Sequence, residues 1–348
     1  MPSQPCVNTR ILQHPLTGVQ RFVKSVLFYL PELDRLAPKK PLSGIRAHAW
    51  EQAVLPFQVK SRLLWSPVPS GPLAVRKQVV TVHDLVPLDN PEWLNPAFAA
   101  WYRFLLPRLL RRAEHLIAIS GFTRSRLVKR LNLDPEKISI VANGVDKRFN
   151  PQARKTTPEA GQRLDLPGPD YILALGSLEP RKNLPRLLMA WKHILPGLPA
   201  SFWLVIAGGQ GQKSVFRAVD FADIPERVYW TGYVPDELLP GLYAGARIFV
   251  YPPIYEGFGL PVLEAMACGC PVVCSHGGAL PEVAADAAML VDPFSVRDIA
   301  RALHALVDSR ELRQDLQAKG LQQSSRFSWE KTAAQTRAIL RRVQGRSD

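Results

Sequence analysis

The feature that most limits the fold of this chain is a regular alternation of short apolar runs and helical patterns between residues 170 and 309. The apolar runs have strand length, and most end in a glycine, a proline or a small polar residue, as buried strands do. The segments between them carry apolar residues at helical spacing. Strands that alternate with helices of about ten residues form a parallel sheet covered by helices on both faces.

The alternation predicts individual elements along the whole chain. In the second half, strands are predicted over 170–177, 202–207, 227–234, 247–253, 271–275 and 287–291, and helices over 183–195, 236–246, 260–269 and 295–309. The first half follows the same pattern less regularly, with strands predicted over 6–12, 78–86, 115–120 and 137–145, and helices over 18–30 and 121–131.

These elements predict two α/β units joined near residues 155–168, where the sequence is polar and rich in proline and glycine. We expect a basic Rossmann-like domain over 1–160 and a second Rossmann-like domain over 161–325. A C-terminal helix within 326–348 is expected to pack back toward the first domain. Ligands of such sheets bind beyond the carboxyl ends of the strands, so we expect the two domains to face each other across one cleft.

The charge is distributed unevenly between the two halves. Residues 1–165 hold 25 Lys and Arg against 12 Asp and Glu, a net charge of +13, whereas residues 166–348 hold 19 against 18. The densest part, 101–130, carries eight basic residues and one glutamate, interleaved with aromatic residues and leucines. This composition favours an anionic membrane surface as a partner. Long side chains covering the core are the alternative, and no nucleic-acid-binding module is recognisable.

The sequence offers little sign of a membrane span, a leader or a metal site. No run of 18 apolar residues occurs, and the N-terminal residues lack the apolar core of a signal peptide. We therefore expect a cytoplasmic protein, free or held at the inner face of the plasma membrane. Cys268, Cys270 and Cys274 cluster without further ligands at finger-like spacing, so we predict no metal site and interpret them as packing residues.

The stretch GSLEPRKN, from Gly176 to Asn183, follows a predicted strand and opens a predicted helix. Backbone N–H groups at a helix start attract anions, and Arg181 and Lys182 add two cations there. This combination predicts a diphosphate site. The alternative is a solvated basic pair, although cations near a helix N-terminus are unfavourable.

Two glutamates lie eight residues apart in YEGFGLPVLEAMACGCPVV, residues 255–273, which contains no basic residue. Glu256 lies in a predicted turn and Glu264 lies in the helix that follows. Carboxylates accept hydrogen bonds from paired hydroxyls, so both residues are candidates for binding a sugar or a ribose. One surface glutamate and one buried, paired glutamate remain the alternative.

This last stretch resembles the E-x7-E motif of retaining, nucleotide-sugar-dependent glycosyltransferases of the GT-B type, family 4. The resemblance extends over about residues 7–343 and includes LTGVQRFVKSV, VTVHDLVPLDNPEW, KISIVANGVD and LALGSLEPRKNLPRLLMAW. The N-terminal pattern is most similar to mannosyltransferase-like members that build bacterial surface polysaccharides. The fold that it implies is GT-B, an α/β architecture of two doubly wound, Rossmann-like domains. The resemblance implies that the domain over 1–160 binds the acceptor and that the domain over 161–325 binds the nucleotide-sugar donor.

The resemblance also implies roles for individual residues. Glu264 would bind the ribose, Glu256 the donor sugar and Lys182 the diphosphate, while His83 would lie near the anomeric carbon. The expected catalytic set is His83, Arg181, Lys182 and Glu256. The expected donor-binding set is Gly18, Gly176, Ser177, Gly232, Tyr233, Gly257, Phe258, Gly259, Leu260 and Glu264.

The sequence departs from the family pattern at two of these positions. Ser177 stands where many members have an arginine, so we expect Arg181 to supply that cation. Thr17 precedes Gly18 where paired glycines are common.

The implied reaction moves a hexose, such as mannose, from a nucleoside diphosphate sugar to a hydroxyl of a glycan or a lipid-linked acceptor. No cofactor is implied, and because the chain has no Asp-x-Asp, no metal is implied either. Front-side attack, with the leaving phosphate taking the proton, would give retention. The alternatives are a nucleotide-sugar epimerase or phosphorylase of the same fold, or a catalytically silent sugar- or lipid-binding partner.

Overall fold

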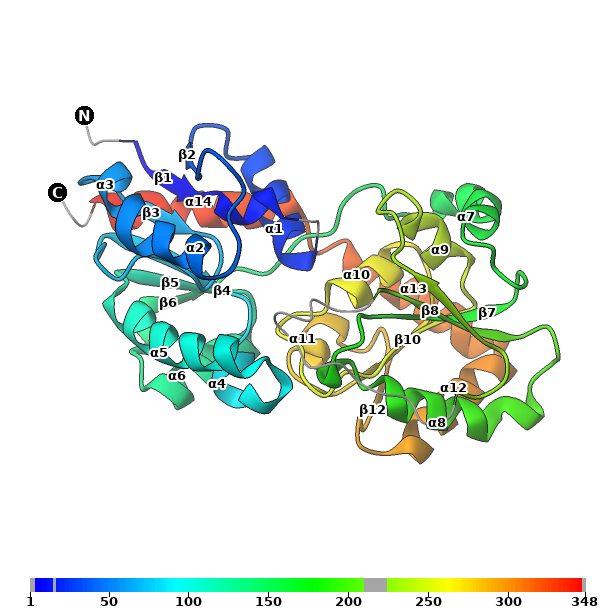
Figure 1. The fold of residues 1–348 in the computed structure, drawn as a ribbon. Helices are drawn as coiled ribbons and strands as arrows, with labels where there is room; N and C mark the ends of the chain where they lie inside the picture. Colours follow the sequence, from blue (N-terminus) through cyan, green and yellow to red (C-terminus); the bar gives the residue numbers. More distant parts are fainter. Residues whose placement is uncertain (1–3, 15–16, 210–223, 346–348) are drawn as a thin grey trace. The chain divides into compact units, whose positions relative to one another are not determined.

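The computed structural model describes residues 4–14, 17–209 and 224–345, and it divides the chain into two compact units (Figure 1). The first unit comprises residues 1–91, 99–144 and 327–348, and the second comprises 92–98 and 145–326. The division after Gly144 lies 16 residues before the boundary that the sequence predicted. The reason is that 3-10 helix η5 (Pro151–Thr156) and helix α7 (Thr157–Arg163) pack on a helix of the second unit, where the Thr157 hydroxyl donates to the Gly241 carbonyl at 2.9 Å.

The first unit is built on a parallel sheet of six strands in the order β2-β1-β3-β4-β5-β6. The strands are β1 (Cys6–Asn8), β2 (Asp34–Leu36), β3 (Leu64–Ser66), β4 (Gln78–Val82), β5 (His115–Ala118) and β6 (Ile138–Ile140). The helices are α1 (Gly18–Phe28), α2 (Gly44–Ala49), α3 (Leu55–Val59), α4 (Val86–Asp89), α5 (Pro96–Arg112), α6 (Gly121–Leu131) and α14 (Trp329–Gly345). The strand order reverses direction between β1 and β3, which makes that pair the switch point of this sheet.

Strand β1 is shorter than the predicted strand over residues 6–12. The Asn8 side-chain oxygen accepts a hydrogen bond from the Arg10 backbone N–H at 3.2 Å, and this local turn ends the strand. Arg10–Gln13 then form a 3-10 helix, η1. The short strands β2 and β3 and the helices between them were not predicted, because their apolar runs are too brief to show a period.

The second unit also has a parallel sheet of six strands, in the order β12-β11-β10-β7-β8-β9. The strands are β7 (Tyr171–Leu175), β8 (Trp203–Ala207), β9 (Val228–Gly232), β10 (Ile248–Tyr251), β11 (Val272–Ser275) and β12 (Met289–Val291). The remaining helices are α8 (Leu184–Ile194), α9 (Leu239–Gly245), α10 (Leu260–Ala267), α11 (Leu280–Ala284), α12 (Val296–Asp308) and α13 (Arg310–Ser324). Here the strand order reverses between β7 and β10.

Helices cover both faces of this second sheet, as the alternation predicted. Along β7, Tyr171 and Leu173 belong to a core shared with α9 and α10, whereas Ile172 and Ala174 belong to a core shared with α8 and α12. Because successive strand residues point to opposite faces, a strand covered on both sides must be apolar throughout. This requirement explains the near-continuous apolar runs.

The C-terminal helix α14 belongs to the first unit and packs against α1. The rings of Phe22 and Trp329 meet edge to face at 6.0 Å, and the Thr332 hydroxyl donates to the Ala142 carbonyl at 2.7 Å. Gly144 lies directly under the start of this helix, since a Cβ there would come within 2.1 Å of the Trp329 backbone nitrogen. The chain end is therefore integrated into the first unit by close packing.

Candidate functional site

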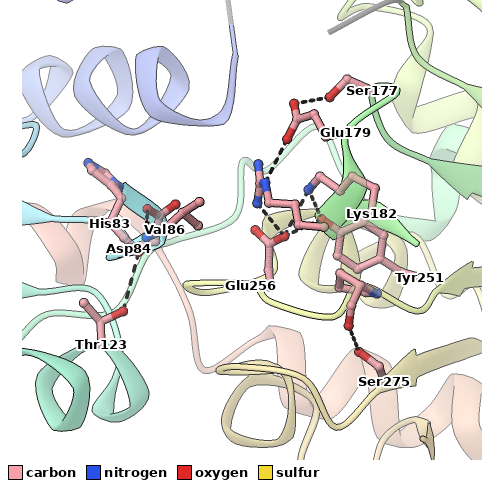
Figure 2. A network of polar contacts seen from close by, with 12 residues as sticks. His83, Asp84, Val86, Thr123, Ser177, Glu179, Lys182, Tyr251, Glu256 and Ser275 are labelled. Carbon is pink, nitrogen blue, oxygen red and sulfur yellow. Dashed lines mark hydrogen bonds and ion pairs between the residues drawn. The ribbon is translucent and has the colours of Figure 1, made fainter. Parts of the chain in front are cut away.

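The candidate site of the second unit forms at its switch point, where the loops after β7 and β10 leave the sheet (Figure 2). Gly176 and Ser177 follow β7, and a 3-10 turn, η6 (Pro180–Lys182), then leads into α8. Asn183 joins the two loops, because its side-chain amide donates to the Pro252 carbonyl at 2.9 Å. Arg181 and Lys182 thus lie in the turn before the helix that the sequence predicted.

A cluster of charges occupies this switch point. The Lys182 ammonium lies 3.0 Å and the Arg181 guanidinium 3.1 Å from Oε2 of Glu256. The Tyr251 hydroxyl donates to the same oxygen at 2.8 Å, and Lys182 also contacts the Tyr251 hydroxyl. Two cations and a phenol therefore contact one carboxylate oxygen. Lys182 and Arg181 lie 74 and 75 positions before Glu256 in the chain, so only the fold brings them together.

Burial and the charges of neighbouring groups determine the pKa values in this cluster. Burial alone would raise the pKa of Glu256, but the charges of Lys182 and Arg181 outweigh it and lower the pKa to about 2. Burial and the neighbouring Arg181 lower the pKa of Lys182, and burial together with Glu256 raises the pKa of Tyr251 well above its usual value. At neutral pH the cluster therefore holds a charged carboxylate and a protonated phenol.

Glu179 and Ser177 extend the cluster and were not predicted as a linked pair. The Glu179 carboxylate accepts a hydrogen bond from Nε of Arg181 at 2.8 Å, and the Ser177 hydroxyl donates to its other oxygen. Arg181 is thus held between Glu179 and Glu256, facing the switch point. Ser177 contributes to positioning this arginine, although the serine itself carries no charge. The signal that sequence reasoning missed is Glu179, only two residues before Arg181.

The backbone of Glu256 is fixed by the loop that follows β11. The Glu256 carbonyl accepts the Ala279 N–H at 2.9 Å, and Gly278 has a φ of +68°. A Cβ at Gly278 would lie 2.1 Å from the Glu256 carbonyl oxygen, so only glycine allows this approach. Gly257, Phe258 and Gly259 are buried between this contact and the start of α10 at Leu260.

Glu264 lies on α10 as predicted, and its carboxylate is buried. The Tyr243 hydroxyl donates to Oε2 of Glu264 at 3.1 Å. Glu264 therefore contacts a phenol, whereas Glu256 contacts two cations and a different phenol. Neither side chain is exposed at the surface, as the alternative interpretation required for one of them. Tyr243 is a further residue that sequence reasoning missed.

Gly232 and Tyr233, two members of the expected donor-binding set, lie at the carboxyl end of β9. Gly232 ends the strand with a φ of +69°, and its carbonyl accepts the Gly208 N–H at 2.9 Å. The Tyr233 side chain is 68% exposed, which is unusual for a large aromatic residue. An exposed ring beside strand ends can provide a stacking surface.

The other two predicted residues, His83 and Gly18, belong to the first unit. His83 follows β4, and its Nε2 lies 2.9 Å from the Pro67 carbonyl oxygen. Because a carbonyl only accepts hydrogen bonds, we assign the proton to Nε2. Burial lowers the pKa of His83 to about 4, so the ring is neutral at pH 7. Gly18 is the first residue of α1, whose start is capped by Thr17 and Gln20.

The structure also bears on the cysteines and on metal binding. All four cysteines are buried and free, and burial raises the pKa values of Cys268 and Cys274 to about 12. Within the described ranges, no group of three or more His, Cys, Asp or Glu side chains is arranged to hold a metal ion. Over the same ranges, no helix is both long and apolar enough to cross a bilayer.

Comparison with known proteins identifies the family. The family model described as "Glycosyl transferases group 1" matches residues 158–323, and the model described as "Glycosyltransferase Family 4" matches residues 20–149. The O-antigen chain mannosyltransferase B of Escherichia coli is 34% identical over 267 residues, which cover 76% of this chain and 70% of that protein. The chain belongs to glycosyltransferase family 4. It is a glycosyltransferase rather than an epimerase or a phosphorylase.

Other relatives match over different shares of their length. The MMP alpha-(1->4)-mannosyltransferase of Mycolicibacterium hassiacum is 31% identical over 287 residues, 77% of this chain and 66% of the relative. The serotype-specific mannosyltransferase WbdA of Escherichia coli is 29% identical over 74% of this chain. That match covers 32% of WbdA, so this glycosyltransferase spans about a third of that relative.

Solved structures establish the GT-B fold of this glycosyltransferase. Sucrose-phosphate synthase from Thermosynechococcus elongatus has a TM-score of 0.76 at 19% identity, covering 98% of this chain and 99% of that one. WaaG, a glycosyltransferase involved in lipopolysaccharide biosynthesis, has a TM-score of 0.71 at 15% identity, covering 97% and 98%. At these identities the likeness concerns the fold alone.

Proposed function

We propose that this glycosyltransferase moves a mannosyl residue, with retention, from a nucleoside diphosphate sugar to a hydroxyl of a growing surface polysaccharide. The donor sugar is suggested by the relatives, since O-antigen chain mannosyltransferase B and RfbU of Salmonella typhimurium are both described as mannosyltransferases. RfbU is 30% identical over 63% of this chain. Guanosine diphosphate mannose is therefore the first donor to test.

The observation that carries the proposal is the pairing of Arg181 and Lys182 with Glu256 at the switch point. When the bond between the sugar C1 and the diphosphate oxygen breaks, negative charge develops on the diphosphate. Two cations fixed beside the sugar-binding carboxylate stabilise that charge where it appears. Glu179 and Ser177 hold Arg181 in place, so little reorganisation is needed during the reaction.

Each remaining donor contact has a candidate in the second unit. The buried Glu264 carboxylate would accept the ribose hydroxyls, the exposed Tyr233 ring would stack on the base, and Glu256 would accept hydroxyls of the sugar. The backbone from Gly257 to Leu260 and the loop at Gly176 would line the diphosphate and the sugar. In the first unit, Gly18 and the neutral His83 are the proposed contacts.

In the proposed chemistry, the acceptor hydroxyl oxygen bonds to C1 on the face that the diphosphate leaves. The electron pair of the breaking bond stays on the diphosphate, and a diphosphate oxygen takes the hydroxyl proton. The anomeric configuration is thereby retained. Since Arg181 and Lys182 already supply positive charge, we propose turnover without a divalent cation. Full loss of turnover in EDTA that Mg²⁺ or Mn²⁺ restores would contradict this part of the proposal.

The test of the function is release of nucleoside diphosphate from a panel of donors, with and without acceptor glycan. We expect acceptor-dependent release with GDP-mannose, and smaller or no release with UDP-glucose, UDP-GlcNAc and dTDP sugars. The anomeric configuration of the product follows from NMR. Release with another donor alone would overturn the mannosyl assignment, and acceptor-dependent inversion would overturn the mechanism.

We also propose that the acceptor is lipid-linked and that the enzyme meets it at the inner face of the plasma membrane. The support is the net charge of +13 in residues 1–165. The predicted surface over 101–130 needs revision in detail, however. Arg126 and Arg130 pair with Asp89 at 2.5 Å and 3.8 Å, and Arg111 donates to the Leu131 carbonyl at 3.4 Å. Part of the basic charge there is used within the first unit.

A further inference from the structure

The segment from Gly44 to Val59 presents an apolar face to solvent. It is one continuous helical stretch composed of α2, a π-helical turn η2 (Trp50–Val54) and α3. Ile45 is 88% exposed and Phe57 is 81% exposed, among the highest values for large apolar side chains in the described residues. The exposed residues of the segment are Gly44, Ile45, Arg46, Ala49, Ala53, Val54, Phe57 and Gln58, of which only Arg46 is charged.

The π-helical turn brings the two ends of this face into line. In a continuous α-helix, twelve positions at about 100° each would place Phe57 about 120° away from Ile45. The Leu55 N–H donates to the Trp50 carbonyl, five residues back, so the turn accommodates one extra residue. Without that extra residue, about eleven α-helical steps separate Ile45 from Phe57. Eleven steps of about 100° make about three turns, so Phe57 lies within about 20° of Ile45 around the helix axis.

The opposite face fixes this orientation. Trp50, Leu55 and Val59 are buried in a core cluster with Cys6 and Leu64 of the sheet. A separate set of polar contacts holds the fully buried Glu51. Its carboxylate lies 3.0 Å from Arg10 and 2.9 Å from the Asn8 amide, and it accepts a hydrogen bond from the Ser70 hydroxyl. The segment cannot rotate to hide Ile45 and Phe57 without exposing these groups, so its apolar face is a stable surface.

The charge around this face is positive. Residues 39–62 contain five basic residues and one acid, the buried Glu51. Lys39, Lys40, Arg46 and Lys60 are exposed, and they lie within this segment or beside its ends in the sequence. Exposed isoleucine and phenylalanine accompanied by exposed cations match an anionic bilayer, in which apolar side chains enter the acyl boundary and cations meet headgroups. A second copy of this surface would bring two positively charged segments together, which is unfavourable.

The same face continues onto α5. The His48 ring lies 5.2 Å from the Trp101 ring, and the Trp101 ring stacks on the exposed Phe104 ring at 6.0 Å. The Arg108 guanidinium lies 3.9 Å above the Phe104 ring. Ile45 is one helical turn from His48, and Phe104 is one turn from Trp101, so both belong to one surface.

We infer that residues 44–59 form a membrane-docking helix that places Ile45 and Phe57 in the interfacial region of an anionic bilayer, with Phe104 at its edge. Access to a lipid-linked acceptor rests on the proposed function, whereas the docking itself is independent of it. This assignment moves the insertion site from the predicted segment 101–130 to a helix whose apolar face the sequence did not reveal. The first unit thereby approaches the bilayer by a defined face.

The first test is co-sedimentation of the whole enzyme with phosphatidylglycerol-rich vesicles. We expect binding at low salt that weakens as salt rises, and weak binding to phosphatidylcholine alone. Ile45→Ser/Phe57→Ser should reduce the partition coefficient about 10- to 100-fold. Phe28→Ser is the matched control, because Phe28 is 76% exposed on α1 of the same unit and should change binding less than about twofold.

A second test reports on insertion directly. Because all four native thiols are buried, a cysteine introduced by Phe57→Cys should react selectively with an environment-sensitive fluorophore. The fluorescence should rise and shift to the blue with phosphatidylglycerol-rich vesicles, whereas the same label introduced by Phe28→Cys should stay in water. An unchanged spectrum at position 57, or equal vesicle binding by parent and double variant, would overturn the inference.

The remaining controls separate docking from catalysis and from self-association. Ile45→Ser/Phe57→Ser should transfer sugar to a water-soluble acceptor as fast as the parent, so a failed transferase assay alongside normal docking would count against the proposed function alone. Sedimentation velocity tests self-association. If the parent is a dimer that does not bind vesicles and the double variant is a monomer, the face joins two copies, and the membrane assignment is overturned.

Discussion

The two sheets of this glycosyltransferase both hold an acidic residue at their switch point, but the two carboxylates are used differently. Glu51 lies between β1 and β3 with 0% exposure, and its oxygens are shared among Asn8, Arg10, Ser70 and His48. Glu256 lies between β7 and β10 with its side chain 14% exposed, and its three recorded donors all reach one oxygen, Oε2.

The difference indicates that the same position in two similar sheets can stabilise the fold in one unit and be available for ligand binding in the other. A buried carboxylate with donors on both oxygens holds together the elements that surround it. A partly exposed carboxylate bonded on one side leaves its other side available to a hydroxyl. In the first unit, the switch point is closed and anchors the membrane-docking helix proposed above. In the second unit, the partly exposed Glu256 is the carboxylate that we propose for binding the donor sugar.

The largest expected effect is on the closed switch point. Glu51→Gln leaves Arg10 buried without its counter-charge, and we expect the first unit to lose about 3–5 kcal/mol of stability. Hydrogen exchange at β1 and β3 measures this loss locally. Glu32→Gln is the matched control, because Glu32 forms a surface pair with Arg337 at 2.7 Å, and it should cost about 1 kcal/mol or less. If Glu256→Gln destabilised its own sheet equally, the contrast between the two carboxylates would disappear.

The open switch point should respond in catalysis. Lys182→Ala removes a cation from the proposed diphosphate site, and we expect kcat to fall about 100- to 1000-fold while the protein stays folded. Single-turnover kinetics with GDP-mannose measures the chemical step. Lys192→Ala is the matched control. It removes a lysine from α8, the helix that follows Lys182, and should leave kcat at the parental value. A normal kcat for Lys182→Ala would mean that the diphosphate lies elsewhere.

A smaller effect is expected at the second glutamate of the motif. Glu264→Gln removes a charged acceptor from the proposed ribose site, and we expect binding of free GDP to weaken by about 1.5–3 kcal/mol. Isothermal titration calorimetry compares the variant with the parent and with Tyr243→Phe, which removes the phenol that donates to this carboxylate. Equal affinity of Glu264→Gln and the parent would restrict Glu264 to a packing role and sharpen the view that Glu256 alone is functional.

The smallest effect concerns pH and belongs to the first unit. Burial lowers the pKa of His83 to about 4, below the value of 6.5 in an unfolded chain. Its contribution to stability is therefore present above pH 6.5 and is lost as the pH falls toward 4, by about 1.4 kcal/mol per pH unit. Hydrogen exchange at β4 should show this loss between pH 6.5 and 5.5, and His83→Gln should flatten it. A slope that survives the substitution would assign the effect to another group.

Several features followed from the sequence because they depend on local order. The strands of the second unit and the helices α8, α10 and α12 lie close to their predicted ranges, since strands buried on both faces must be continuous apolar runs. The α/β class and the position of Glu264 on a helix follow from the same local patterns, whereas Glu256 lies in a loop rather than in the predicted turn. Family membership rests on motifs that are equally local.

The partners of the charged residues depended on tertiary structure, because they are distant in the chain. The sequence showed that Glu256 and Glu264 have no basic neighbour in their own stretch. Only the strand order brings β7 beside β10 and so places Arg181 and Lys182 on Glu256. Glu51 attracted no attention in the sequence, because its partners Asn8, Arg10 and Ser70 meet it only at the first switch point.

The exposed apolar face of residues 44–59 shows the same limit. Isoleucine, valine and phenylalanine in a helical stretch predict a buried face by composition alone. The packing of Trp50, Leu55 and Val59 on the sheet decides which apolar residues are covered, and one π-helical turn decides that Ile45 and Phe57 share the uncovered side. The sequence by itself determined the strands and most helices of the second unit, the fold class and the residue types of the site. Tertiary packing decided which of those residues meet, because long-range contacts and solvent exposure depend on how the sheets are ordered and covered.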